Sequence, residues 1–357
     1  MREEEKQLFF ELCKCCNGKP EGGSLVYATP YVLGHLFFNR MQGIAYDTLS
    51  RNGMLEFANR EFRNSLKNAY EQNMQKNQSY FQCVKWMAEL LASCKCKVAM
   101  LKGAYLCAYY PAGCRTSNDI DLLLLDQDVT VVGNLLRANG FVQGNIRSGK
   151  LIPATREEII AAKMMRGETV PFIKKVDLPD MMYLEVDINF SMDYKNGEKD
   201  VISKILEKSS AKEIKGISIP TLCTEDFFIH LCAHLYKEAT TLPWIEMHRD
   251  MSLYKYSDIY VLLNSMKDDE VEKVFSRAES LGLVKVCAYA ILETADLFDV
   301  KEGMAVQLSK RILQKDPFFC LTVVAPKEKR TWRYQTSKAS ARFFLESRIL
   351  DLKEVQK

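Results

Sequence analysis

The chain has 357 residues, of which 47% are hydrophobic and 27% charged, a composition typical of a folded globular protein. Its formal net charge of +3 is too small to indicate a protein dedicated to duplex nucleic acid. No apolar run approaches the roughly 20 residues of a membrane-spanning helix, and the N-terminus MREEEK does not resemble a secretory signal. We therefore expect a cytoplasmic protein without a membrane partner, divided into roughly two or three domains.

Residues 1–96 carry a helical pattern. Apolar side chains recur at spacings of three and four, as in Val32, Leu36 and the long segment Met54–Leu91, which has few helix breakers. That segment predicts one long helix or two consecutive helices. Residues 1–96 are therefore interpreted as an N-terminal helical region.

The pattern changes at Lys97, where short apolar runs alternate with helical stretches. Thr155 and Glu158 form a capping-box pattern at the start of one of these helices. The expected order is typical of a mixed sheet with helices on it, over residues 97–222. The expected elements are strand 98–101, helix 104–110, strand 120–125, helix 128–138, an extended segment from 141, helix 156–165, and strands 170–176 and 181–190 as an antiparallel pair.

After Pro220 the chain is expected to be helical to its end, which makes residues 223–357 a C-terminal helical domain. Thr224 is a suitable N-cap for the first of these helices. The expected helices cover 225–239, 250–265, 268–281, 283–297 and 301–313.

The chemistry-bearing motif is Asp119-Ile120-Asp121, which leads directly into the apolar run Leu122–Leu125. Side chains two apart on a strand lie on one face, so the two carboxylates repel each other unless a cation lies between them. Mg²⁺ and Mn²⁺ are the usual partners of oxygen-only ligand sets. A solvated acidic pair is the common alternative, but the position at the head of a buried strand favours a metal site.

A further acid is expected from residues 183–190, where Leu184, Val186 and Ile188 alternate with polar residues. Burying those three leaves Glu185, Asp187 and Asn189 on the opposite face. The alternation alone does not separate Glu185 from Asp187, and an ordinary solvated strand face would have the same pattern.

Positive charge near the acids is supplied by Lys102, in the turn Leu101-Lys102-Gly103-Ala104, and by Arg115. Glycine in a strand-to-helix turn lets backbone N–H groups approach a phosphate closely. Either cation could neutralise phosphate oxygens, although each considered alone is more often a surface charge.

Together these motifs resemble the polymerase-β-like nucleotidyltransferase superfamily. The match is closer to its uncharacterised nucleotidyltransferase family, a bacterial group with the pattern LKG…R…SDIDLL. That pattern is present here as Leu101-Lys102-Gly103, then Arg115, then Ser117–Leu123. The family's helix rich in leucine and histidine resembles residues 229–235, and the resemblance covers roughly residues 97–260.

The resemblance implies an α+β fold, in which a mixed-sheet, palm-like catalytic domain is flanked by the two helical regions. It implies that Asp119 and Asp121 hold divalent metal ions, Mg²⁺ or Mn²⁺, and that Asp187 is the third acid, which also binds metal and helps activate the incoming hydroxyl. The nucleotide-binding residues that it implies are Lys102, Gly103, Ala104 and Arg115.

The function that follows from the resemblance is metal-dependent transfer of a nucleoside monophosphate from a nucleoside triphosphate such as ATP to an acceptor hydroxyl, with release of pyrophosphate. The acceptor could be a small molecule, a protein or tRNA. Ala104 departs from the superfamily pattern, which has glycine or serine there, and so removes one expected phosphate contact. The alternatives are a nucleotide-binding regulatory module without turnover and the toxin of a toxin–antitoxin pair.

Two further motifs are interpreted as structural. His230 and His234 have a spacing that can bind zinc, but the acid of an HExxH motif and an obvious third ligand are missing, which favours helix packing. Nucleic acid is a less favoured partner because the net charge is near zero. The basic residues that could bind it surround Trp332 and Tyr334 and are Lys327, Lys329, Arg330, Arg333, Lys338 and Arg342.

Overall fold

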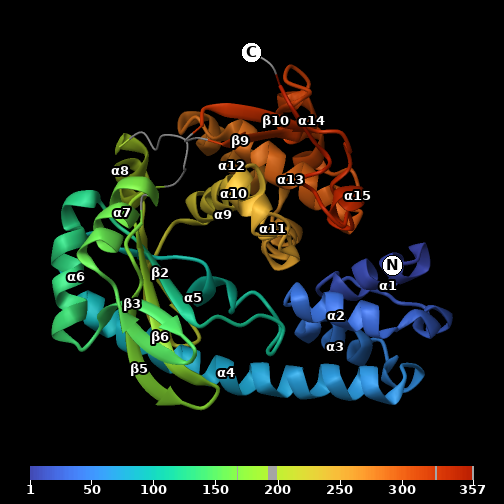
Figure 1. The fold of residues 1–357 in the computed structure, drawn as a ribbon, viewed down its shortest axis with the longest axis horizontal. Helices are drawn as coiled ribbons and strands as arrows, with labels where there is room; N and C mark the ends of the chain where they lie inside the picture. The colour runs from blue at the N-terminus through green and yellow to red at the C-terminus, as the bar shows by residue number, and fades with distance from the viewer. Residues whose placement is uncertain (167, 192–198, 326–327, 356–357) are drawn as a thin grey trace. The chain divides into compact units, whose positions relative to one another are not determined.

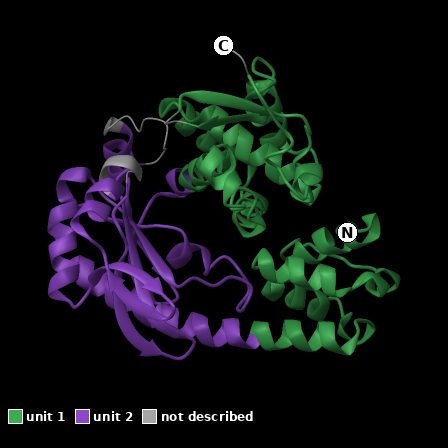
Figure 2. Ribbon diagram, viewed as in Figure 1, with its two compact units in different colours: residues 1–70, 228–357 green, residues 71–227 purple. Residues whose placement is uncertain are grey.

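In the computed structural model, the middle of the chain forms one unit and the two ends together form another (Figure 2). Unit 1 contains residues 1–70 and 228–357, and unit 2 contains residues 71–227. These bounds differ from those of the three regions predicted from sequence (1–96, 97–222 and 223–357), because helix α4 (Arg60–Ala92) runs from the first unit into the second. The structure describes residues 1–166, 168–191, 199–325 and 328–355.

Unit 2 is built on an eight-stranded mixed sheet of order β4-β3-β5-β6-β2-β1-β8-β7. β2 pairs with β6 and β1 with β8 in parallel, whereas the other neighbours are antiparallel. This mixed sheet, together with the helices, confirms the predicted α+β class. The strands are β1 (Ala99–Met100), β2 (Asp119–Leu123), β3 (Val142–Arg147), β4 (Lys150–Pro153), β5 (Phe172–Leu178), β6 (Met181–Asn189), β7 (Ser210–Ile214) and β8 (Ile217–Thr221).

Helices α4 and α6 flank the sheet (Figure 1) and contact it through aromatic side chains. Trp86 of α4 stacks on Phe141 at a centroid distance of 5.6 Å, and Arg137 of α6 lies over the ring of Phe172 in β5. The predicted capping box is confirmed at α7, where Thr155 N donates to Glu158 and Glu158 N donates to Thr155 Oγ1. The helices are α5 (Gly103–Leu106), α6 (Val129–Ala138), α7 (Arg156–Arg166) and α8 (Lys199–Glu207), with a 3₁₀ turn η3 (Asp126–Asp128).

Two features of unit 2 differ from the sequence expectations. The helix expected over 104–110 ends at Leu106, because the next residues close tighter i→i+3 turns, with Ala108 N bonded to Tyr105 O and Tyr109 N to Leu106 O. The hairpins β3–β4 and β7–β8 were not assigned from sequence. Their strands are short and largely exposed, so they lack a strong alternation of buried and exposed side chains.

Unit 1 is mainly helical, as expected for the N-terminal region, but the prediction that the chain stays helical to its end is wrong. Strands β9, β10 and β11 form an antiparallel sheet near the C-terminus. Val323 and Tyr334 of this sheet form a small core with Ile245. The strands are β9 (Thr322–Ala325), β10 (Arg330–Tyr334) and β11 (Leu352–Glu354).

The helices of unit 1 enclose two buried ion pairs. Arg342 pairs with Glu293, and Arg348 makes two bonds, of 2.6 and 2.7 Å, to Asp250. None of the helices in the described part of the chain has the length and apolar character that crossing a bilayer requires. The helices are α1 (Glu3–Cys13), α2 (Pro30–Phe38), α3 (Gln42–Arg51), α9 (Thr224–Ala239, from Phe228), α10 (Leu242–Glu246), α11 (Leu253–Ser265), α12 (Asp268–Ser280), α13 (Val284–Phe298), α14 (Met304–Leu313) and α15 (Ala339–Phe343), with 3₁₀ turns η1 (Gly22–Tyr27), η2 (Leu55–Phe57) and η4 (Phe319–Leu321).

Candidate active site

The predicted acids lie side by side on two neighbouring strands at the centre of the sheet of unit 2. β2 and β6 are parallel, and their register pairs Asp119 with Glu185 and Asp121 with Asp187. Paired residues of adjacent strands, about 4.8 Å apart, point to the same face. The four carboxylates therefore share one face, while the alternating residues of β6 are fully buried on the other.

Lys102 neutralises part of this acidic face. Its Nζ lies 3.0 Å from Oδ1 of Asp121, and the amide of Asn189 donates to the same oxygen at 3.4 Å. The Lys102 side chain is 20% exposed and that of Asp121 8%. This ion pair is therefore held in a largely dehydrated setting, where electrostatic interactions are stronger than in water.

The backbone of Lys102 is strained, with φ 42° and ψ −108°. A non-glycine residue in such a conformation costs on the order of 1–3 kcal/mol and persists only where its surroundings enforce it. Leu101 N donates to Asp121 O at 2.9 Å, which fixes the turn beside β2. Residue 102 is thus held in position to place its ammonium group on Asp121.

Gly103 is required at its position because Ser117 and Tyr80 press against it. A Cβ at residue 103 would lie 2.6 Å from Ser117 Cβ and Oγ, and 2.8 Å from the hydroxyl of Tyr80. The hydroxyl of Ser117 donates to Oδ1 of Asp119 at 2.5 Å, and that of Tyr80 donates to the carbonyl of Asp119 at 3.0 Å. The glycine turn therefore has a steric role in positioning Asp119.

The acids differ in protonation behaviour. Burial raises the pKa of Asp119, but the Ser117 hydroxyl bond and the charges of Lys102 and Arg115 outweigh it, so the net pKa is lowered. Burial and the charge of Asp119 together raise the pKa of Asp121 more than Lys102 and Asn189 lower it. The pKa of Asp187 is raised well above its usual value by burial and then by the charges of Asp121 and Asp119.

Glu185 is less tightly coupled to the other acids. Its pKa is raised by burial and, to a lesser extent, by Asp119. Asp187, in contrast, interacts with both aspartates of the Asp119-x-Asp121 motif. The register places Asp187 beside Asp121 and Glu185 beside Asp119, and the choice of Asp187 as the third acid stays a prediction.

Arg115 acts on the acids through its charge, and Ala104 follows the glycine of the turn. The guanidinium of Arg115 donates to the carbonyl of Thr116, and its charge lowers the pKa of Asp119. Ala104 is fully buried. Because α5 has only four residues, its dipole is small, and Lys102 is the main cation of the glycine turn.

The oxygen donors suit Mg²⁺ or Mn²⁺, but they are not already gathered around a metal-sized space. Among the described residues, no group of three or more His, Cys, Asp or Glu side chains is arranged closely enough to hold a metal ion. The two aspartates that face each other across β2 and β6 provide a pair of carboxylates, one of which now binds Lys102. A metal ion would therefore compete with Lys102 for Asp121.

The histidines of α9 pack against their own helix. His230 and His234 stack at a centroid distance of 6.4 Å, and Nε2 of His234 lies 3.2 Å from Oε1 of Glu238, one turn further along. These contacts fit the packing role expected from sequence. Both residues belong to unit 1, whereas the acids belong to unit 2.

Two of the described basic residues near the C-terminus are engaged in ion pairs. Arg342 is buried against Glu293, and Arg330 pairs with Glu354. Lys327 lies outside the described residues. That nucleic acid is a less favoured partner stays a prediction.

Sequence reasoning did not identify two positioning residues, Tyr80 and Ser117. Ser117 stands two residues before Asp119, a spacing at which a hydroxyl often bonds locally, so this signal was present. Tyr80 lies far away in sequence, within α4, and is fully buried. Nothing in its local pattern separates it from an ordinary core aromatic residue.

Comparison with known proteins gives one strong match. A family model described as an uncharacterised nucleotidyltransferase matches residues 32–299. No curated protein matches the sequence. One matching solved structure is that of an antigenic nucleotidyltransferase-like protein from Paracoccidioides brasiliensis, which is 14% identical, with 56% of this chain and 87% of that chain covered and a TM-score of 0.33.

Proposed function

The chain belongs to the uncharacterised nucleotidyltransferase family, and from this premise we propose that it transfers a nucleoside monophosphate from a nucleoside triphosphate to an acceptor hydroxyl. The observation that carries the proposal is the register of β2 and β6, which pairs Asp121 with Asp187 and Asp119 with Glu185. Phosphoryl-group chemistry depends mainly on positioning and on charge stabilisation. An acidic face on rigid central strands, bordered by Lys102, suits both needs.

In the proposed reaction, the acceptor oxygen attacks the α-phosphorus and the bond to the β-phosphate oxygen breaks, so pyrophosphate leaves. The proton of the acceptor hydroxyl passes to the carboxylate of Asp187. Lys102 and Arg115 stabilise the negative charge that develops on the phosphate oxygens. Lys102 can stabilise the phosphate oxygens only after its ammonium group moves from Asp121 to the nucleotide.

Asp119, Asp121 and Asp187 are the residues proposed to hold Mg²⁺ or Mn²⁺. When bound, such an ion neutralises phosphate charge and aligns the attacking and leaving oxygens. The present pairing of Lys102 with Asp121 supports an exchange of partners, in which the lysine is displaced toward the triphosphate. In the nucleotide-free protein, the same lysine reduces the repulsion between the carboxylates.

The test is pyrophosphate release from each of the four nucleoside triphosphates, with and without Mg²⁺, when a sugar, a protein and tRNA are each supplied in turn as the acceptor of the nucleoside monophosphate. Release should require Mg²⁺ and should fall at least about 100-fold in the Asp121→Asn variant. The matched control is Asp177→Asn, because Asp177 lies on β5 of the same unit and its side chain is 60% exposed. Equal release by the Asp121→Asn variant and the wild type would refute the site.

A further inference from the structure

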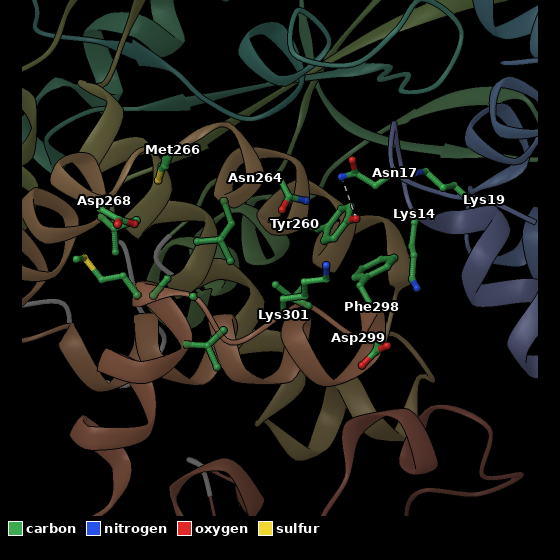
Figure 3. Close-up of a pocket in the computed structure, with 17 residues that line it drawn as sticks. Lys14, Asn17, Lys19, Tyr260, Asn264, Met266, Asp268, Phe298, Asp299 and Lys301 are labelled. Atoms are coloured by element: carbon green, nitrogen blue, oxygen red, sulfur yellow. Dashed lines mark hydrogen bonds between the residues drawn. The ribbon is translucent and has the colours of Figure 1, made fainter. Parts of the chain in front are cut away.

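Unit 1 contains a pocket that the proposed reaction does not use. Its volume is about 590 Å³, within the range of roughly 300–1,000 Å³ that is usual for small-molecule sites. It is lined by the loop after α1, by α11 with the start of α12, and by the segment that joins α13 to α14 (Figure 3). None of the candidate active-site residues lines it.

Three lysines line this pocket: Lys14, Lys19 and Lys301. Lys14 is paired with Glu11 at 2.9 Å. Within the described part of the chain, no ion pair is found for the other two, Lys19 and Lys301, and both residues are exposed. Cations from separate segments that line one hollow and are not held in ion pairs can bind an anion there.

The wall between these cations is formed by stacked aromatic rings and offers hydrogen-bonding groups. Tyr260 stacks on Phe298 at a centroid distance of 4.7 Å, and the amide of Asn17 donates to its hydroxyl at 3.1 Å. Figure 3 shows the Lys301 amine directed toward Tyr260. The hydroxyl, the amide and the ammonium group thus face one part of the pocket.

The rest of the lining is apolar. Leu263, Met266, Val300 and Met304 are all only partly buried and contribute hydrophobic surface. The lining also has two acids. Figure 3 places Asp268 at the end away from Lys14 and Lys19, and Asp299 at the same end as Lys14. The pocket therefore has an end where three lysines outnumber the single acid Asp299, an apolar body, and a far end where Asp268 opposes binding of an anion.

We propose that this pocket binds a small phosphorylated molecule with an apolar or aromatic body, its phosphate against Lys19 and Lys301 and its body along Leu263 and Val300. Several lysines should bind a phosphate dianion more strongly than a single carboxylate, because the dianion carries more negative charge. The two lysines act as point charges, and the apolar surface supplies the remaining affinity. The proposal is independent of the proposed transferase activity.

The test is a titration with phenyl phosphate, a phosphomonoester on an aromatic ring, followed by calorimetry on the full-length protein. Benzyl alcohol serves as the neutral analogue. The double variant Lys19→Gln/Lys301→Gln should bind phenyl phosphate about tenfold more weakly than the wild type, a loss of about 1.4 kcal/mol. The control double variant Lys273→Gln/Lys310→Gln removes the same charge from unit 1 outside the pocket and should retain wild-type affinity.

The remaining outcomes decide against the proposal. It is overturned if the wild type does not bind phenyl phosphate, if the pocket variant binds as tightly as the wild type, or if benzyl alcohol binds as well as the phosphate. It is also overturned if Lys102→Gln abolishes binding while the pocket variant retains it, because the phosphate is then bound in unit 2. Circular dichroism of each variant verifies folding, which the exposed lysines should not affect.

Discussion

Replacing Gly103 with alanine should damage both stability and catalysis. The added Cβ would lie 2.6 Å from Ser117 Cβ and Oγ, so Ser117 or the turn must move. Overpacking of this kind costs roughly 1–3 kcal/mol in the free energy of unfolding, measured by urea denaturation. Because Ser117 holds Asp119 by a 2.5 Å bond, pyrophosphate release should fall by about 100-fold, the cost of a misplacement near 1 Å.

The matched control is Gly34→Ala. Gly34 lies within α2, and a Cβ there meets no atom within 4 Å, so alanine should be neutral or stabilising by about 0.5–1 kcal/mol. The variant Ser117→Gly removes two of the three atoms that clash, at the expense of the bond to Asp119, and leaves the hydroxyl of Tyr80 at 2.8 Å. In the double variant Gly103→Ala/Ser117→Gly the loss of stability should be smaller than the sum of the two single losses by at least about 0.5 kcal/mol. Strict additivity, or equal stability of the two alanine variants, would contradict the steric argument.

Three further predictions concern charge. Asp187→Asn should abolish Mg²⁺-dependent pyrophosphate release, and without Mg²⁺ it should raise the free energy of unfolding by roughly 0.5–2 kcal/mol because it relieves the repulsion between carboxylates. Glu185→Gln should retain activity within a few-fold. The reverse pattern of activity in these two variants would make Glu185 the third acid. Lys102→Met should destabilise the protein by roughly 3 kcal/mol in urea denaturation, which is the low end for breaking a buried ion pair. The same variant should raise the pKa of Asp121, measured by NMR of its carboxyl group. An unchanged pKa would show that the ion pair is unimportant. Arg348→Met should cost about 3–5 kcal/mol, measured the same way, because it leaves a buried carboxylate without its bidentate partner; a loss below about 1 kcal/mol would contradict this.

The sequence was sufficient to place the acids and their strands. The alternation of Leu184, Val186 and Ile188 with polar residues has the period of a half-buried strand, and the structure buries those three. The sequence could not determine which acid of β6 lies beside which aspartate of β2. Register between strands is set by tertiary pairing and is not encoded in the spacing of either strand alone.

The residues that hold the acids in position were harder to predict from the sequence. Tyr80 contacts Asp119 from a helix 39 residues away in sequence, a long-range contact without a local signal. The strands β9, β10 and β11 are three to five residues long, so none of them shows enough periods of alternation to compete with a helical interpretation. The strained backbone of Lys102 is likewise a consequence of packing, because nothing about a lysine predicts a positive φ.

The central claim is that the acids of β2 and β6 bind a divalent metal together with a nucleotide. The most direct measurement is the thermal midpoint of the wild type and of Asp121→Asn with each nucleoside triphosphate, with and without Mg²⁺. At least one triphosphate should raise the wild-type midpoint by a few degrees only when Mg²⁺ is present, since binding at about 100 times Kd adds about 2.7 kcal/mol. The absence of any such rise, or a rise of the same size in Asp121→Asn, would contradict the account.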